Sequence, residues 1–212
     1  MIKKNDFIEL EYTGKTKEEG YVFDTTQESL AKKERIHNPQ GSYGPTVICV
    51  GQQHILPGLD IFLEGKEIGS YTIELPPEEA FGKKSAKLIQ LIPTSKFRQQ
   101  KIQPQPGLQV NIDGHIGVVK TVTGGRTLVD FNHPLSGKYV VYDIKVNKKV
   151  NDKKEQLSAI LKMRLGMTEE KVEVHENKAT ITSKHDIPNP IQEQINKEIK
   201  ELTGLTDITW KK

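Results

Sequence analysis

The segment from residue 46 to residue 75 constrains the fold of this chain more than any other. It opens with the β-branched, apolar run Thr46–Val50, which favours a strand in the interior of a sheet. A short helix should follow, because three apolar side chains share one face at i, i+3 and i+4: Leu59, Phe62 and Leu63. Gly65 predicts the end of the helix, and the alternation over residues 70–75 predicts another strand. We therefore expect a sheet that carries a short helix between two of its strands.

The residues around this segment add further strands. Residues 7–12 alternate between apolar and polar side chains, as a half-buried strand does, and Gly14 predicts the end of that strand. A second short strand is predicted at residues 21–24. Residues 25–45 are mostly polar, so we expect a long surface bulge with one helical turn. A strand over residues 139–146 should return to the same sheet.

The chain changes character after Gly82. The apolar run at residues 87–92 predicts a strand, and the alternation over residues 108–112 predicts another. Asp113-Gly114 is a strong signal for a hairpin turn, and two more strand patterns follow it. Residues 84–128 should therefore form a small β-rich unit, which can bury little apolar surface of its own.

The C-terminal segment, residues 152–212, carries its own start and stop signals. Asp152 followed by Glu155 has the pattern of a capping box at a helix N-terminus. Gly166 and Gly204 predict the ends of two helices. Two strand patterns lie between the helices and one follows them. The predicted order is helix, strand, strand, helix, strand, which indicates an α/β domain.

Charge and composition disfavour several classes of protein. The net charge is +3 with both signs mixed along the chain, unlike the clustered basic excess of a nucleic-acid-binding protein. No apolar run approaches membrane-spanning length, and no secretory signal is visible, so we expect a cytoplasmic protein. The single cysteine, Cys49, lies in an apolar run and is predicted to be a buried structural thiol. The histidines are dispersed without metal-ligand spacing, so no metal site is expected.

Three short motifs occur in a specific order. Phe23-Asp24 precedes the stretch Gly51–Leu59, with the sequence GQQHILPGL, and Glu79-Ala80-Phe81-Gly82 follows it. In this order the chain resembles the FK506-binding-protein (FKBP) family of peptidyl-prolyl isomerases, over residues 3–83 and 129–148. The interruption after the third motif resembles the SlyD-like branch of that family. The additional C-terminal segment is similar to that of long archaeal members.

The resemblance implies an α+β protein of three parts. Residues 1–83 and 129–148 would form a discontinuous FKBP domain, an antiparallel half-barrel sheet with a short helix. Residues 84–128 would be an inserted β-rich domain, called insert-in-flap in this family, and residues 152–212 a C-terminal domain. In similar long members that domain is associated with dimer formation, so a homodimer is one expectation. An ordinary intramolecular core explains its two apolar helix faces equally well.

The resemblance also implies a proline-binding pocket and a reaction that needs no cofactor. Rotation about an X-Pro bond is slow because of amide resonance, and a pocket that favours the twisted amide accelerates it. Asp24 would point its carboxylate towards the twisted bond, and the Leu56 N–H would hold a substrate carbonyl. The other pocket residues implied by the family are Tyr12, Phe23, Ile55, Leu59, Phe81, Leu135 and Tyr142.

Without the family, the same residues have simpler interpretations. Phe23, Ile55, Leu59 and Tyr142 are then core side chains, Tyr12 covers a strand edge, and Asp24 closes a turn. Two departures from the family pattern also matter. Leu59 stands where many FKBPs carry tryptophan. Phe81 stands where tyrosine is usual, which removes one hydrogen bond, typically worth about 1 kcal/mol. The implied pocket is therefore more apolar than is usual.

In SlyD-like proteins the inserted domain binds unfolded chain and passes it to the isomerase pocket. A small sheet with open edges can add an extended peptide by main-chain pairing, while its apolar side chains contact alternate residues of the peptide. The partners implied are unfolded or partly folded polypeptides with X-Pro bonds. The candidate client-binding residues are Ile89, Leu91, Ile92, Phe97, Val110 and Val118, each with the core of the unit as the alternative.

Two other functions stay open from the sequence. A holdase without isomerase activity is compatible with Leu59 and Phe81, although Phe23 and Asp24 favour an active pocket. A metal-delivery protein is disfavoured, because the His-rich tail of bacterial SlyD is not seen here.

Overall fold

The computed structural model describes residues 1–168 and 171–211. By its internal contacts the chain divides into two units, which we call the first unit (residues 1–75 and 140–212) and the second unit (residues 76–139). In the described part of the chain, no helix has the length and apolar character needed to cross a membrane.

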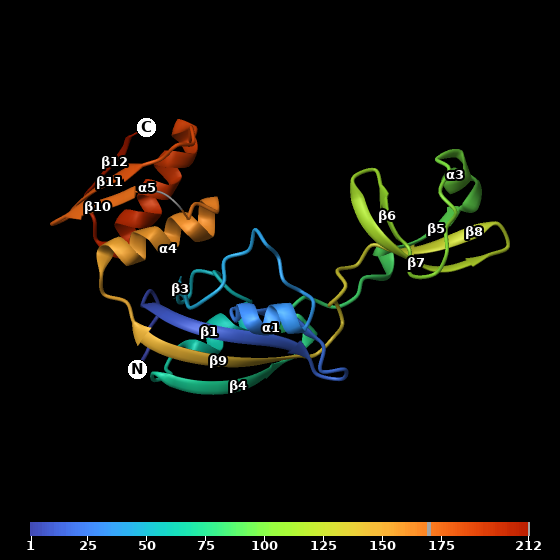
Figure 1. Cartoon of the computed structure of the whole chain (residues 1–212), viewed down its shortest axis with the longest axis horizontal. Helices are drawn as coiled ribbons and strands as arrows, with labels where there is room; N and C mark the ends of the chain where they lie inside the picture. The colour runs from blue at the N-terminus through green and yellow to red at the C-terminus, as the bar shows by residue number, and fades with distance from the viewer. Residues whose placement is uncertain (169–170, 212) are drawn as a thin grey trace. The chain divides into compact units, whose positions relative to one another are not determined.

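A five-stranded antiparallel sheet forms the centre of the first unit. Its strands follow the order β2-β1-β9-β4, and β3 pairs with β1 outside this path. β1, β9 and β4 lie side by side in Figure 1. The strands are β1 (Phe7–Thr16), β2 (Val22–Thr25), β3 (Thr46–Cys49), β4 (Gly69–Leu75) and β9 (Val140–Lys149).

β1 continues through Gly14, so the predicted end of the strand at this glycine is wrong. Gly14 pairs with Tyr142 on β9 and with Asp24 on β2. A Cβ at this position would lie 2.8 Å from the Tyr142 ring and 2.9 Å from the Phe23 ring. Glycine is thus needed here because two aromatic rings pack closely over the strand.

β3 lies at an edge of the sheet, which corrects the prediction of an interior strand. Among the described strands it pairs only with β1. Ile48 and Cys49 are nevertheless fully buried, because helix α4 (Lys153–Leu165) packs beside β3. The β-branched run therefore predicted correctly that this strand is buried, but a helix covers it and not a second neighbouring strand.

Two short helices belong to this part of the first unit. α1 (Glu28–Lys33) lies in the polar segment, where one helical turn is predicted. α2 (Pro57–Leu63) follows the predicted apolar spacing and buries Leu59 and Leu63. The Phe62 ring of α2 meets Tyr71 of β4 edge-on, with ring centroids 5.8 Å apart. This contact holds α2 against the sheet.

The C-terminal segment contains α4, β10 (Lys171–His175), β11 (Lys178–Thr182), α5 (Asn189–Thr203) and β12 (Asp207–Lys211), in the predicted order. The Asp152 carboxylate caps α4 by accepting the Glu155 N–H at 2.8 Å. Gly166 and Gly204 end the two helices with positive φ of 66° and 70°. β10 and β11 form a hairpin, and α5 crosses over to place β12 parallel to β11. Both helices lie beside this sheet in Figure 1.

The C-terminal segment and the first sheet share one hydrophobic core. Phe7 and Cys49 of the sheet belong to the same cluster of buried side chains as Leu161 of α4 and Ile199 of α5. The described residues of this segment therefore pack within the first unit and complete the burial of one end of its sheet.

The second unit is a four-stranded antiparallel sheet with the order β5-β8-β7-β6, so that β5 and β6 are its edges. Asp113 and Gly114 both have positive φ, 52° and 83°, and form the predicted hairpin turn. The core consists of Phe97, Val110, Val119 and Val129. The elements are β5 (Ile89–Pro93), α3 (Thr94–Gln99), β6 (Gln109–Ile112), β7 (His115–Thr123) and β8 (Arg126–Asp130), preceded by short 3₁₀ turns at Pro77–Glu79 and Ala86–Leu88.

Candidate functional site

A cavity of about 380 Å³ opens in the first unit beside β1 and β2. Its walls come from these strands, from the loop after α1 and from the turn that leads into α2. Four residues implied by the family resemblance line it together: Tyr12, Phe23, Asp24 and Ile55. The fold thus gathers side chains that are far apart in the sequence around one space.

Aromatic rings form the apolar side of this site. The Tyr142 ring lies 5.9 Å from Tyr12 and 5.8 Å from Phe23 between centroids, and it meets Phe23 edge-on. Such tilted aromatic pairs are favourable arrangements that fix the rings in place. Tyr142 and Leu59 are both 3% exposed, so they are buried in the fold.

A hydrogen bond joins the two polar groups of the cavity. The Tyr12 hydroxyl donates to Oδ2 of Asp24 at 3.0 Å. The surrounding protein removes part of the water around Asp24 and raises the pKa of its carboxyl, although hydrogen bonds from Tyr12 and from the Thr25 N–H oppose this rise. Burial and the nearby Asp24 charge raise the pKa of Tyr12. The site therefore holds an oriented carboxylate that is only partly hydrated.

Three threonines, on β1 and at the end of β2, hold Tyr12 and Asp24 in place. The Thr26 hydroxyl accepts the Tyr12 N–H at 3.0 Å, and the Thr26 N–H donates to the Tyr12 carbonyl at 3.0 Å. The Thr25 and Thr13 hydroxyls are hydrogen-bonded at 2.9 Å. Asp24 lies on β2, and these hydrogen bonds at the end of the strand hold it next to Tyr12.

The turn before α2 is held by a buried carboxylate. Asp60 is 6% exposed and accepts the N–H groups of Gly51 at 2.7 Å and Gln53 at 2.9 Å. The Leu56 carbonyl accepts the N–H groups of Leu59 and Asp60, whereas its own N–H has no acceptor among the described residues. The turn therefore presents Ile55 to the cavity and leaves a main-chain donor beside it. An aspartate on the apolar face of a predicted helix was the available signal for this role.

The far wall of the cavity was not predicted from the sequence. Part of it comes from the loop after α1, where His37 stacks on Tyr43 with centroids 5.2 Å apart. The rest comes from the C-terminal segment, because Lys162 and Met163 of α4 line the same cavity. No sequence signal links a helix in the last third of the chain to this site.

Phe81 and Leu135, two further residues implied by the family, belong to the second unit. Phe81 stacks on His133 with centroids 4.9 Å apart and an angle of 3° between the rings. The Leu135 N–H donates to Nδ1 of His133 at 3.2 Å, and the Ser136 hydroxyl donates to the Phe81 carbonyl at 3.1 Å. These contacts bring Phe81 and Leu135 together through His133. Their contact with a substrate stays a prediction.

The six candidate client-binding residues divide between the two faces of the second unit's sheet. Phe97 and Val110 are 3% and 5% exposed in its core, and Ile92 packs against them. The other three, Ile89, Leu91 and Val118, lie on the opposite face, as strand alternation and the pairing register require. Three of the six candidates therefore lie on the face that points away from the core of the unit.

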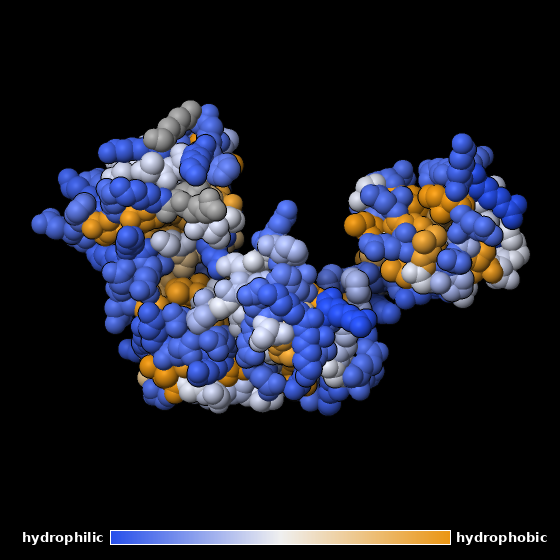
Figure 2. Space-filling view, viewed as in Figure 1, coloured by the Kyte–Doolittle hydropathy of each residue, from blue (hydrophilic) through white to orange (hydrophobic). Residues whose placement is uncertain are grey.

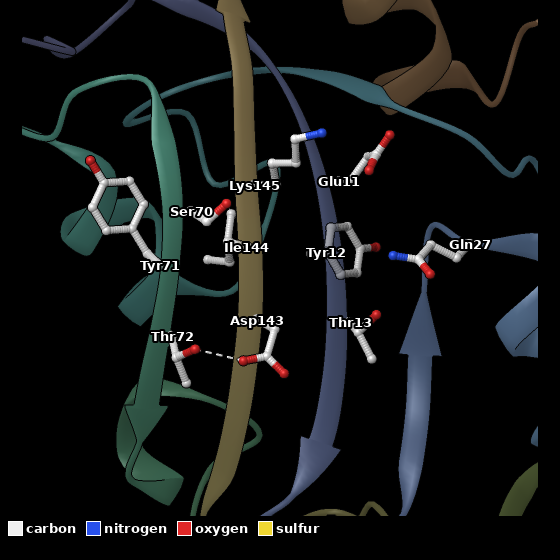
Figure 3. A pocket seen from close by; sticks show the side chains of 10 residues that line it. All are labelled: Glu11, Tyr12, Thr13, Gln27, Ser70, Tyr71, Thr72, Asp143, Ile144 and Lys145. Carbon is white, nitrogen blue, oxygen red and sulfur yellow. Dashed lines mark hydrogen bonds between the residues drawn. The ribbon is translucent and has the colours of Figure 1, made fainter.

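A second groove, of about 370 Å³, runs over the other face of the first sheet (Figure 3). Its lining is polar, and the Thr72 hydroxyl donates to Asp143 at 2.6 Å across neighbouring strands. Lys15 pairs with the same carboxylate at 2.9 Å. Tyr12 and Tyr71 are among its lining residues, but Phe23, Asp24 and Ile55 are not, so the cavity beside β2 is the better candidate.

Cys49 does not line the cavity beside Asp24. Burial raises the pKa of the Cys49 thiol to about 12, so the group is a buried thiol at neutral pH. Within residues 1–168 and 171–211, no group of three or more His, Cys, Asp or Glu side chains is arranged to hold a metal ion.

Known proteins of one family match this chain. The model of the FKBP-type peptidyl-prolyl cis-trans isomerase family matches residues 1–103, and a model described as "FKBP26, IF domain" matches residues 90–135. A short-type peptidyl-prolyl cis-trans isomerase of Methanocaldococcus jannaschii is 33% identical over 147 residues, which cover 69% of this chain and 92% of the relative.

Bacterial members are also similar. An FKBP-type 16 kDa peptidyl-prolyl cis-trans isomerase of Escherichia coli is 35% identical over 108 residues, covering 48% of this chain and 72% of the relative. The FKBP-type isomerase SlyD of Aeromonas hydrophila is 31% identical over 142 residues, covering 66% of this chain and 60% of the relative. Together with the aromatic cavity beside Asp24, these matches show that the chain belongs to the FKBP-type peptidyl-prolyl cis-trans isomerase family, with SlyD-like relatives.

Proposed function

We propose that this protein accelerates X-Pro isomerisation in unfolded and partly folded polypeptides, and that its second unit holds the client chain. The observation that carries the proposal is the cavity in which Tyr12, Phe23, Asp24 and Ile55 meet. An apolar enclosure with one oriented carboxylate suits a proline ring and an amide that must twist. It contains neither an activated nucleophile nor a metal site within the described residues.

The reaction requires differential binding and no covalent step. The barrier to rotation, about 18–20 kcal/mol, arises from amide resonance, which is lost when the bond twists. The twisted amide is less polar at its oxygen than the planar form, so an apolar cavity penalises it less. Contacts of Phe23 and Ile55 with the proline ring, and of the Leu56 N–H with a client carbonyl, would hold the chain on either side of that bond. Stabilising the twisted form more than the planar form accelerates both directions of exchange.

Asp24 supplies the electrostatic part of this mechanism. As the C–N bond twists, the nitrogen regains its lone pair and the carbonyl carbon regains partial positive charge. The Tyr12 hydroxyl fixes the Asp24 carboxylate at 3.0 Å, and the carboxylate is only partly hydrated. It can therefore stabilise that carbon without a costly rearrangement of side chains or water. This role requires the ionised form of Asp24.

The second unit offers an apolar surface for the client. Five side chains from three strands share the face opposite its core, and Figure 2 shows apolar residues at the visible surface of this unit. Leu91 is 52% exposed and Ile116 is 60% exposed, so both side chains are open to a client. The five residues, which we call the outer stripe, are Ile89, Leu91, Ile116, Val118 and Leu128.

Two features of the outer stripe suit an extended polypeptide. Both edge strands of the sheet, β5 and β6, carry unpaired main-chain groups on one side, to which an extended chain can add. Apolar side chains on the outer stripe can then contact alternate residues of the client. Neither interaction reads a particular sequence, so clients should be recognised with low specificity.

The test is refolding of a denatured protein whose slow phase is limited by an X-Pro step. The wild-type chain is compared with the double variant Leu91→Ser/Ile116→Ser. The matched control is Val122→Ser, which alters an apolar side chain of the same unit that is 37% exposed but pairs with Thr127 on the core side. We expect the double variant to accelerate protein refolding much less than the wild type, while its rate with a short proline peptide is unchanged.

Three results decide the proposal. Equal acceleration by the double variant and the wild type would remove the client-binding role of the outer stripe. Acceleration of neither substrate by the wild type, with aggregation still suppressed, would show a holdase instead of an isomerase. Loss of peptide activity in the double variant would mean that the substitutions act on the cavity or on folding.

A further inference from the structure

We infer that helix α4 of the C-terminal segment supplies specificity-determining residues to the isomerase cavity, with Lys162 selecting clients that carry a carboxylate side chain near the proline. The inference rests on the proposed isomerase function of the cavity. It goes beyond that function by assigning a charge preference to residues that lie outside the motifs shared with the family.

Lys162 and Met163 share the cavity with the central groups of the site. They line the same space as Tyr12, Phe23 and Asp24, although more than a hundred positions separate them in the sequence. Both side chains are half-buried, and α4 is fixed in place because its buried residues, Leu157 and Leu161 among them, are part of the common core. A client chain that fills the cavity would therefore lie next to α4.

A hydrogen bond holds Lys162 against another lining residue of the cavity. Its Nζ donates to the Ser42 hydroxyl at 2.9 Å, and Ser42 also lines this space. Ser42 is neutral, so the bond orients the ammonium group without cancelling its charge. Among the described residues, no carboxylate pairs with Lys162.

The neighbouring Arg164, unlike Lys162, is paired with a carboxylate. Its guanidinium is paired with Glu198, with Nη2 at 2.8 Å and Nε at 2.9 Å from Oε1. Arg164 is therefore committed to the contact between α4 and α5. The charge of Lys162 is the one on this part of α4 that remains available to a client, within the residues that the structure describes.

The two α4 side chains would act on different parts of a client. The Lys162 ammonium attracts a Glu or Asp side chain and repels Lys and Arg, while the flexible Met163 thioether adapts to varied apolar neighbours. Because Lys162 is partly exposed, the preference should be modest and should weaken as salt is added. This makes ionic strength a useful second readout.

The experiment measures isomerisation of short X-Pro peptides by NMR exchange with the full chain. The probes are peptides of one length in which a single Glu, Gln or Lys occupies each position flanking the X-Pro pair in turn. At low salt we expect kcat/KM for at least one Glu position to exceed that of the matching Lys peptide by about two- to five-fold. Lys162→Glu should reverse this ratio, and 0.5 M salt should reduce it towards one.

Controls separate the charge from its surroundings. Lys154→Ala removes a positive charge from an exposed site of α4 outside this cavity and should leave the ratio unchanged. Ser42→Ala removes the orienting bond while the charge remains, so the preference should weaken without reversing. Lys162→Arg should retain it.

The outcomes for the inference and for the underlying function are distinct. If the wild type accelerates no peptide, the proposed isomerase function fails. If the wild type accelerates the Gln peptides but Glu and Lys peptides react equally well at every position, the inference is overturned. It is also overturned if Lys162→Glu lowers kcat/KM for all peptides by the same factor. Lys162 would then only hold the loop that contains Ser42 and would not select clients by charge.

Discussion

The Tyr12 hydroxyl and the Asp24 carboxylate form the polar side of an otherwise apolar cavity. Tyr12→Phe removes the donor at 3.0 Å and leaves the ring in place. Because that bond favours the charged form of Asp24, its loss should raise the pKa of Asp24 further. We expect the acid limb of kcat/KM to move to higher pH and the plateau value to fall about three- to ten-fold. A pH profile of peptide isomerisation measures both effects.

Tyr71→Phe is the matched control for this prediction. Tyr71 also loses a donated hydrogen bond, at 2.9 Å to the Glu67 carbonyl, but it does not line the cavity beside Asp24. Its pH profile should match that of the wild type. An unchanged profile in Tyr12→Phe would show that the carboxylate works without the tyrosine.

Substitution of Gly14 tests whether the rings of Phe23 and Tyr142 must keep their positions for catalysis. In Gly14→Ala the new Cβ would lie 2.8 Å from Tyr142 and 2.9 Å from Phe23, so both rings must shift. Overpacking of this kind costs about 1–3 kcal/mol in the free energy of unfolding. We also expect lower peptide isomerase activity per folded molecule, measured after correction for the folded fraction.

Gly117→Ala provides the comparison in the second unit. Its Cβ would lie 2.7 Å from Phe131 and 2.7 Å from Val129. This clash is of similar severity but does not involve the rings of Phe23 and Tyr142. Stability should fall while activity towards short peptides is retained. Full activity of folded Gly14→Ala would contradict the importance of the ring positions.

At the scale of elements, His54 links the turn before α2 to the contact with α5. Its side chain is 1% exposed, with Nε2 4.0 Å from Glu198. Nδ1 accepts the Cys49 N–H at 3.1 Å, so the proton of the neutral ring belongs on Nε2, which has no hydrogen-bond partner among the described residues. Burial and, to a smaller extent, Arg164 lower the pKa of His54, whereas Glu198 and Asp60 oppose them.

The lowered pKa predicts a specific loss of stability in mild acid. The unfolded chain binds a proton at His54 near pH 6.5 while the folded chain does not, so the free energy of unfolding should fall as the pH drops below about 6.5. The fall should end at the lower pKa of the folded state. His54→Asn retains an acceptor for the Cys49 N–H and should show less of this decline between pH 7 and pH 5, measured by urea unfolding.

Carboxylates affect a different range of pH. The pKa values of Asp6 and Asp143 are lowered from that of an ordinary aspartate, so the stabilisation that these two groups provide is lost only in stronger acid. Equal pH dependence of the wild type and His54→Asn between pH 7 and pH 5 would contradict the account of His54.

Local patterns predicted most elements, and the exceptions have physical reasons. The spacing of Leu59 and Leu63 predicted α2, and Asp113-Gly114 predicted a hairpin, because these signals depend on neighbouring residues alone. α3 was missed, because six residues with one buried aromatic, Phe97, give no measurable periodicity. Gly14 was read as a strand end because its reason for being glycine is an aromatic pair supplied by other strands.

The site could be predicted only where short motifs carry it. The sequence identified Tyr12, Phe23, Asp24 and Ile55 through the family resemblance, and the fold brings them together around one cavity. Lys162 could not be found in the same way, because its place at the cavity arises from packing between distant parts of the chain.

At the scale of the whole molecule, the division into two units predicts two separate responses to substitution. Leu161→Ala leaves a cavity in the core shared by the first sheet and the C-terminal segment, and Phe97→Ala leaves one in the core of the second unit. Each should cost about 2–5 kcal/mol in its own unit. Calorimetry should show two transitions, of which each variant lowers one.

Hydrogen exchange shows which unit each transition belongs to. Amides of β1 and α4 should lose protection together in Leu161→Ala, because both belong to the unit that shares this core. Separate loss of protection in β1 and α4 would contradict a single core for the first unit.

The central claim is that the cavity beside Asp24 catalyses rotation about an X-Pro bond. The most direct measurement is NMR exchange between the cis and trans forms of a short proline peptide, with and without a small amount of the full chain. We predict faster exchange with the wild-type chain and loss of most of that acceleration in Phe23→Ala, which removes one apolar wall while Asp24 remains. Peptide binding without any acceleration of exchange, or full acceleration by folded Phe23→Ala, would contradict it.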